Sequence, residues 1–280
     1  MTSEKPLCCR EVPFGNRPGL TLLELVVVLT ILVAVAGLLV PLLPNFVHRA
    51  NVASCTTNIS ELDKIIQTYQ GTYGQNPDRM DNLVIGGSLA SYALTGSTGQ
   101  YGQASFVAGT LTAAELTSLN SSGINNVANL VENAGGDWRP TAWPYNADAS
   151  TTATITPLGT NVAVLTQTGA NLMGVPFSSN YKYVIFGMNK PCTLFRNMAE
   201  EPPYHFADTP AEDPATYYMC FAAVFLVTHE VQDTQGNLTS QTLSAAKYVG
   251  TVAFHDFGLA TADSHTKEWW DQLKNDRPTN

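Results

Sequence analysis

The sequence predicts an α+β fold in which a long N-terminal helix packs by its second half on a C-terminal antiparallel sheet. Three observations support this prediction. Residues 20–43 are almost wholly apolar, and a stripe of apolar side chains at helical spacing follows over residues 52–73. The last third of the chain then holds three segments rich in Val, Phe, Tyr and Ala. A helical period followed by strand-like segments is typical of this fold class.

The apolar run from Leu20 to Leu43 has 24 residues, and its only polar members are Thr21, Glu24 and Thr30. A helix of this length is about 36 Å long, which is enough to cross a bilayer core of about 30 Å. We therefore expect residues 20–43 to form a transmembrane helix. A carboxylate in such a helix costs roughly 2.5–3.5 kcal/mol at its centre and less near an end. Glu24 is therefore expected to have a function.

The first 19 residues indicate how this helix is oriented. They carry three basic and two acidic side chains, a net charge of +1: Lys5, Arg10, Arg17, Glu4 and Glu11. Basic residues before a span are retained in the cytoplasm, so the C-terminal part is expected on the other side of the membrane. The run is too long for an ordinary secretory signal, and its small residue, Gly19, precedes it. The whole chain has a formal net charge of −9 and no basic cluster, which argues against nucleic-acid binding.

Residues 44–75 are predicted to form an amphipathic continuation of the helix, after a bend at Pro41 and Pro44. Its apolar stripe recurs at steps of three and four: Val52, Cys55, Ile59, Leu62, Ile66, Tyr69 and Tyr73. We expect this stripe to pack on the chain's own globular domain. A coiled-coil seam is less favoured, because the pattern lasts only about three heptads before Gly71 and Gly74.

Residues 76–280 are predicted to form an extracytoplasmic globular domain. Residues 111–119 predict a short helix, with Thr112 as its N-cap and Glu115 three residues later. Short strands are predicted at residues 152–155 and 162–166. The segments 181–187, 217–230 and 246–255 predict three antiparallel strands, with a turn signal over residues 233–237 between the last two.

The residues Gly19-Leu20-Thr21-Leu22-Leu23-Glu24 resemble the cleavage and methylation motif of type IV prepilins and of the pseudopilins of type II secretion. In that family a membrane-embedded aspartyl peptidase cuts after the glycine and N-methylates the new first residue. The resemblance implies that residues 1–19 are a cleaved leader and that Leu20 becomes the N-terminus. Leu20 departs from the phenylalanine that is commonest in the family, while Pro41 falls where the family often has a helix-kinking proline.

The resemblance also implies a function. The chain would have a type IV pilin-like fold and would serve as a structural subunit of a type IV pilus-like filament or a secretion pseudopilus, with pseudopilin or minor pilin favoured. Glu24 would pair with the amine of a neighbouring subunit during assembly. The implied partners are homologous pilin or pseudopilin subunits, the prepilin peptidase, an assembly ATPase and a platform membrane protein. The implied location is the inner membrane, with a periplasmic C-terminal domain, and then the filament or cell surface.

A signal-anchored periplasmic enzyme or binding protein that never polymerises is the alternative function. The enzyme hypothesis has little support, because the sequence contains no GxSxG, HExxH, GxGxxG or P-loop pattern. Its histidines at positions 205, 229, 255 and 265 are scattered. We therefore expect no catalytic residue in this chain.

The cysteines predict one disulfide. Cys192 and Cys220 would close a loop of about 29 residues, worth about 3–4 kcal/mol in an oxidising compartment. Cys55 is expected to be a small buried hydrophobic residue, although its pairing with either of the other two remains open. Paired CxxC or HxxxH spacing is absent, so no metal site is predicted. Calcium binding in the acidic loop 200–213 is not favoured over a solvated loop, since EF-hand spacing is also absent. No cofactor is expected.

Overall fold

A computed structural model describes residues 21–39, 43–90, 93, 104–129, 154–205, 218–255 and 258–264. Gly19, Leu20 and Pro41 lie outside the described residues, as does most of the acidic loop. The chain divides into two compact units, Met1–Val47 and His48–Asn280. Most of the predicted amphipathic helix therefore belongs to the same unit as the globular part.

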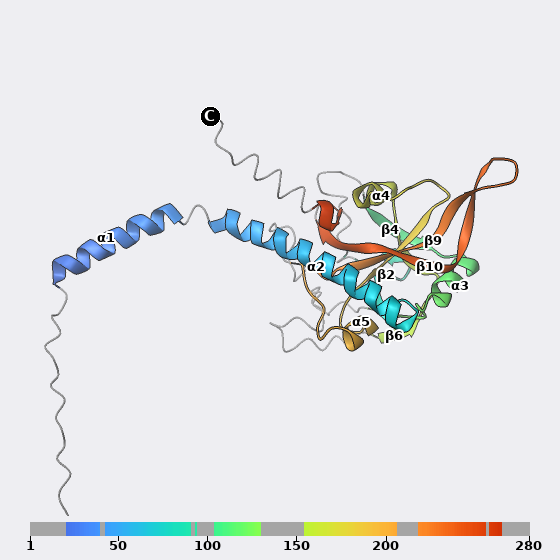
Figure 1. Ribbon diagram of the computed structural model, residues 1–280, viewed down its shortest axis with the longest axis horizontal. Coiled ribbons are helices and arrows are strands. Elements are labelled where there is room, and N and C mark those ends of the chain that lie inside the picture. The colour runs from blue at the N-terminus through green and yellow to red at the C-terminus, as the bar shows by residue number, and fades with distance from the viewer. Residues whose placement is uncertain are drawn as a thin grey trace, which may run out of the picture. The chain divides into compact units, whose positions relative to one another are not determined.

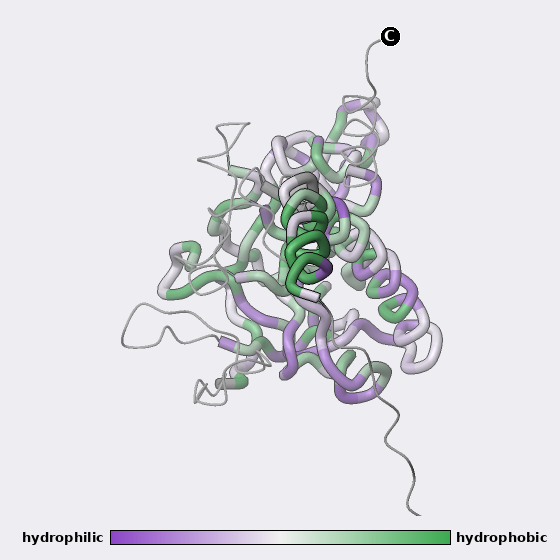
Figure 2. Tube along the Cα trace, turned by 90° about the vertical axis from the view of Figure 1, so that its left-hand side faces the viewer, coloured by the Kyte–Doolittle hydropathy of each residue, from purple (hydrophilic) through white to green (hydrophobic). Residues whose placement is uncertain are grey.

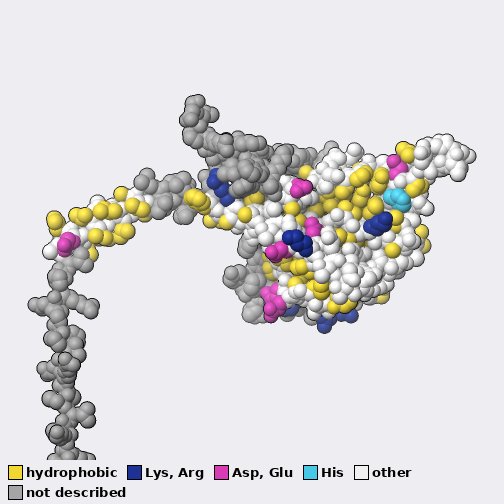
Figure 3. All heavy atoms as spheres, in the orientation of Figure 1, with side chains coloured by type: hydrophobic (Ala, Val, Ile, Leu, Met, Phe, Trp, Pro, Cys, Tyr) yellow, Lys and Arg dark blue, Asp and Glu magenta, His cyan; other side chains and the backbone are white. Residues whose placement is uncertain are grey.

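The first unit contains helix α1 (Leu22–Leu39), whose sequence is apolar on every face because only Glu24 and Thr30 interrupt it. Its described side chains are exposed, including Leu22 at 81% and Val33 at 70%. Hydrophobic residues follow one another along α1 (Figure 2), and hydrophobic side chains cover its visible face (Figure 3). Among the residues that the structure describes, no helix combines the length and the apolar character needed to cross a membrane.

Helix α2 (Leu43–Tyr73) carries the predicted stripe. Six of its seven members are buried: Val52, Cys55, Ile59, Leu62, Ile66 and Tyr69. Tyr73, the last residue of the helix, is 47% exposed and its ring lies against that of Tyr69. The helix ends there because Gly74 adopts a φ of +67° and its N–H donates to the Gln70 carbonyl at 2.8 Å, a C-cap that glycine makes without steric cost.

The second unit is built on one large, mainly antiparallel sheet (Figure 1). Its described strands are β1 (Met80–Asn82), β4 (Phe106–Thr110), β5 (Asn126–Asn129), β6 (Thr154–Pro157), β7 (Asn161–Leu165), β8 (Lys182–Gly187), β9 (Ala222–Gln232), β10 (Leu238–His255) and β11 (Gly258–Ala260). Their order is β11-β10-β9-β8-β1-β5-β6, with β7 also paired to β8 and β4 to β7. Only β1 and β5 pair in parallel among the described strands. A mixed α+β fold is therefore confirmed.

The remaining elements are short. Strands β2 (Val84–Ile85) and β3 (Ser88–Leu89) form a separate hairpin. Helices α3 (Ala113–Ser121), α4 (Gln167–Met173) and α5 (Thr193–Asn197) connect the strands. The predicted strands at residues 152–155 and 162–166 correspond to β6 and β7, each displaced by one or two residues.

The three antiparallel strands predicted in the last third are confirmed as β8, β9 and β10. The turn between β9 and β10 is also confirmed, because Asp233 Oδ1 accepts from the N–H groups of Gln235 and Asn237 at 2.8 Å each. Strand β10 begins eight residues earlier than predicted. Its first four residues are exposed, and after Leu238 they are polar, because this end of the hairpin extends past the rest of the sheet (Figure 1). No apolar alternation is needed there.

Both faces of the central strands are buried. Val184 and Phe186 of β8 belong to one apolar cluster together with the α2 stripe, and Tyr183 and Ile185 belong to a second cluster on the other face. This alternation follows from the two-residue period of a strand. Helix α2 also bonds to β10, because the carboxylate of Asp63 accepts from the Thr251 N–H at 2.9 Å and from the Tyr248 hydroxyl.

Helix α3 begins with the predicted capping box. Glu115 N donates to Thr112 Oγ1 at 3.3 Å, and Thr112 N donates to Glu115 Oε2 at 2.8 Å. The same carboxylate accepts from Lys182 Nζ at 2.8 Å and from Thr228 Oγ1 at 3.0 Å. Burial raises the pKa of Glu115, but these bonds and the charge of Lys182 outweigh it and hold the pKa below its ordinary value. Glu115 therefore ties α3 to β8 and β9.

We expect Glu115→Gln to lower the free energy of unfolding by about 1–3 kcal/mol, because one amide cannot replace the charged acceptor of all three donors. Urea unfolding at pH 7 measures this. The difference from wild type should shrink as the pH falls below the ordinary carboxyl value, since a group with a lowered pKa contributes its stability above that value. Glu61→Gln, on the exposed face of α2, is the control and should change stability by less than about 0.5 kcal/mol. Equal effects of the two substitutions would contradict this role.

Candidate functional site

The first turn of α1 is organised by Glu24 and Thr21. Glu24 Oε2 accepts from the Thr21 N–H at 2.8 Å and from its hydroxyl at 2.9 Å, and Glu24 N donates back to Thr21 Oγ1 at 3.3 Å. This is a capping box, which satisfies backbone donors at the helix start. Glu24 Oε1 makes no hydrogen bond to any described residue, so one carboxylate oxygen is available to a further donor.

In the structure no disulfide joins Cys192 to Cys220, and both side chains are buried, as is that of Cys55. Cys192 belongs to the apolar cluster that contains the α2 stripe, and Cys220 belongs to the cluster on the other face. Burial raises the pKa of Cys192 to about 12 and that of Cys220 well above its ordinary value. Because the thiolate is the reactive form, burial of these two thiols lowers their reactivity.

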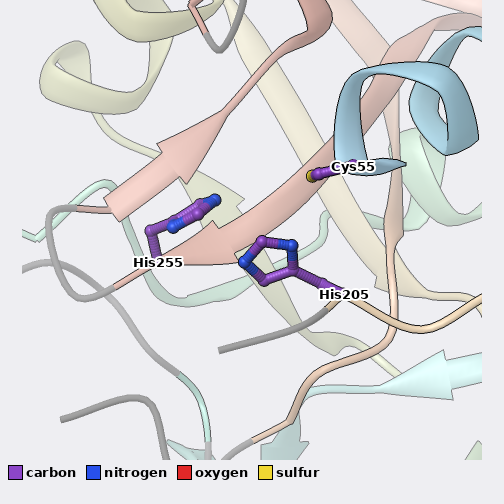
Figure 4. Close-up of side chains that lie close together, drawn as sticks. All are labelled: Cys55, His205 and His255. Carbon is purple, nitrogen blue, oxygen red and sulfur yellow. The ribbon is translucent and has the colours of Figure 1, made fainter. Parts of the chain in front are cut away.

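A buried cluster of metal-ligand side chains was not predicted from the sequence. Cys55 Sγ and ring nitrogens of His205 and His255 all lie within 4.8 Å of one another (Figure 4). The three residues are 2%, 1% and 0% exposed. The rings of His205 and His255 meet edge to face, with their centroids 4.2 Å apart.

Each member of this Cys/His/His cluster comes from a different part of the fold. Cys55 lies on the buried stripe of α2, and His255 is the last residue of β10, where it pairs with Gly258 of β11. His205 is held by its backbone, since its N–H donates to the Met219 carbonyl at 2.8 Å beside the bridge between Tyr204 and Cys220. All three side chains are thus positioned by backbone hydrogen bonds or by a packed helix.

The cluster has no signature in the sequence. Cys55 fits the apolar stripe, and 150 residues separate it from His205, which is itself 50 residues from His255. No spacing motif covers such distances. A thiolate with two imidazoles is nevertheless a donor set that suits zinc and copper, and it leaves a fourth coordination position.

A second buried polar group lies at Asp81 in β1. Its Oδ2 accepts from the Tyr218 hydroxyl at 2.6 Å, and its Oδ1 has no hydrogen-bond partner among the described residues. Burial raises the pKa of Asp81 to about 7, against a smaller lowering by the Tyr218 bond. Gly187 opposite makes room for this pair, because a Cβ at that position would lie 2.2 Å from the Tyr218 hydroxyl oxygen.

A further candidate is a groove beside β1, β5 and β6. Its described lining is neutral and has no titratable side chain: Asn82, Val84, Gly86, Gly87, Val127, Asn129, Thr156, Pro157, Gly159, Thr160 and Asn161. Such a surface offers amide and hydroxyl contacts and no acid–base pair. It therefore gives no support to catalysis there.

Comparison with protein families, with curated proteins and with solved structures finds no match to this chain.

Proposed function

We propose that this chain is a structural subunit of a type IV pilus-like filament or of a type II secretion pseudopilus. The observation that carries the proposal is α1, which exposes large aliphatic side chains on every face and has one carboxylate in its first turn. A helix that is apolar all round is stable only inside a protein core or a membrane. An assembly of such helices meets this requirement, first in the bilayer and then in a filament core.

Glu24 supplies the specificity of that assembly. After cleavage at Gly19, the new amine of Leu20 would lie in apolar surroundings, where an unpaired charge is costly. The carboxylate of Glu24 on a neighbouring subunit can accept from it through Oε1, while Oε2 stays bonded to Thr21. This amine–carboxylate pair can form only when the helices of two subunits lie in one relative register, so it favours that register. The role of Glu24 is therefore recognition between subunits.

The second unit is consistent with this proposal. Its helix α2 shares a buried cluster with antiparallel strands, the arrangement expected of a pilin-like subunit. The subunit would be made in the inner membrane with its N-terminus in the cytoplasm and its domain in the periplasm. It would then be trimmed by the prepilin peptidase and assembled by an ATPase and a platform membrane protein. The size of the domain favours a pseudopilin or minor pilin.

Cleavage is tested with Gly19→Ala. In cells with an active prepilin peptidase, wild-type protein is expected to lose residues 1–19 and the variant to retain them, because the larger side chain blocks the cut. Intact-mass measurement of the membrane fraction detects the difference. Gly37→Ala is the control and should be cleaved normally, since an added Cβ there meets no described residue within 4 Å beyond its own stretch of helix. Wild-type protein that keeps its leader in these cells would contradict the proposal.

The alternative is a signal-anchored periplasmic binding protein that never polymerises, and the neutral groove beside β1 is the feature that favours it. Such a protein would keep its N-terminal residues and would stay in the membrane fraction when filaments are sheared from cells. The same mass measurement therefore separates the two functions.

A further inference from the structure

We infer that Cys55, His205 and His255 form a zinc site that fastens helix α2 to the end of β10 and to the segment at Tyr204–His205. The inference goes beyond filament assembly and does not depend on it. It rests on three metal-ligand side chains that converge from distant parts of the sequence in a buried position.

The geometry is close to that of a metal site. In a tetrahedral zinc centre, bonds of about 2.0–2.3 Å place the ligand atoms about 3.3–3.6 Å apart. Here the sulfur and ring nitrogens all lie within 4.8 Å of one another, so the widest separation must shorten by at most about 1 Å on metal binding. The side-chain torsions of the cysteine and the two histidines are the degrees of freedom that can supply this movement.

The arrangement of the two rings favours a metal. The rings of His205 and His255 meet edge to face with their centroids 4.2 Å apart, so that one nitrogen of each ring can face the same ion beside Cys55 Sγ. Imidazole nitrogen and cysteine sulfur are the usual ligands of zinc. A core filled only for packing would be served by apolar residues, which bury no polar atoms. Two histidines and a cysteine facing one another are therefore better explained by coordination.

The donor set selects the kind of ion. Sulfur and nitrogen ligands favour zinc over magnesium and calcium, which take oxygen ligands. Three protein ligands leave one position of the tetrahedron for water or another donor. The site is far from the first turn of α1 in sequence and lies wholly within the second unit, so its role is to stabilise the domain. The metal would join three segments that are distant along the chain, since 150 residues separate Cys55 from His205 and 50 residues separate His205 from His255.

The experiment uses the purified full chain in detergent, stripped with a chelator and titrated with Zn²⁺, Mg²⁺ and Ca²⁺ in turn. One Zn²⁺ per chain is expected, with a rise of several degrees in the thermal unfolding midpoint that a chelator reverses, and no effect of Mg²⁺ or Ca²⁺. Co²⁺ should give a thiolate-to-metal charge-transfer band. Cys55→Ala and His255→Gln are expected to weaken Zn²⁺ binding at least about 100-fold, and Cys55→Ala should abolish the band.

Matched controls separate loss of a ligand from loss of the fold. Cys192 lies in the same apolar cluster as Cys55, so Cys192→Ala removes an equivalent buried sulfur but should keep both Zn²⁺ binding and the cobalt band. His229→Gln controls for loss of a histidine outside the cluster. The inference is overturned if wild-type protein takes up no Zn²⁺ at micromolar concentration. It is also overturned if Cys55→Ala, shown by circular dichroism to be folded, binds Zn²⁺ as tightly as Cys192→Ala.

Discussion

Replacement of Glu24 by alanine is expected to leave the chain inserted in the membrane and cleaved after Gly19, but to exclude it from filaments. Insertion should persist, because removing a charge from an apolar segment only lowers the insertion cost. Cleavage should persist, because the substitution leaves the glycine and the residues at the cut unchanged. Incorporation should fall by an order of magnitude or more, since each Leu20 amine in the filament core would lack a carboxylate.

Glu24→Gln separates the two roles of this side chain. Glutamine can still accept from the backbone and hydroxyl of Thr21, so the start of α1 stays capped, but it carries no negative charge. If charge pairing decides assembly, the glutamine variant should fail as the alanine variant does. Glu24→Lys should be excluded more completely, because it places two positive groups together. N-methylation of Leu20 is expected to weaken in all three variants.

The measurement compares the sheared-filament fraction with the membrane fraction for each variant. Thr30→Ala is the control within the same helix, since among the described residues the Thr30 hydroxyl bonds to the Val26 carbonyl one turn earlier and to no other group, and it should assemble normally. A cleaved Glu24→Ala chain present in filaments at wild-type levels would show that the account of Glu24 is wrong.

Asp81→Asn is expected to remove a large dependence of stability on pH. The folded pKa of Asp81 is raised from 3.8 to about 7 by burial, so the folded state binds the proton more tightly than the unfolded state. The stability that this group contributes is therefore fully present below about pH 4 and is lost as the pH rises to about 7. Three pKa units correspond to about 4 kcal/mol over this range. Above pH 7 the contribution no longer changes.

Urea unfolding of the detergent-solubilised chain between pH 4 and pH 8 measures this slope. The asparagine variant should lack this slope, so its free energy of unfolding should rise relative to that of wild type as the pH increases. Tyr218→Phe should extend the slope to higher pH, because it removes the hydrogen bond that lowers the Asp81 pKa. Asp263→Asn, at an exposed position, should keep the wild-type slope. A wild-type slope in the Asp81→Asn protein would exclude Asp81 as its source.

Local patterns determined a large part of the fold. The stripe of α2 recurs every three or four residues, so its buried face could be read directly, and only Tyr73 at the helix end departs from it. The capping box of α3 spans four residues. Strands β8 and β9 were recognised by their Val and Phe content, and the β9–β10 turn by Asp233 and Gly236. These signals lie within one helical turn, one strand or one tight turn.

The candidate metal site and the buried carboxylate were decided by the tertiary structure. Cys55 and His255 are 200 residues apart, and Asp81 meets Tyr218 across 137 residues, so no window of sequence contains either pair. The parallel pairing of β1 with β5 could not be predicted either, because both strands are too short to give a clear sequence pattern. By itself the sequence determined which faces of the chain are apolar and where α1 carries its one charge. Which polar side chains meet inside the domain depends on strand order and helix docking, because these set the contacts between residues that are distant along the chain.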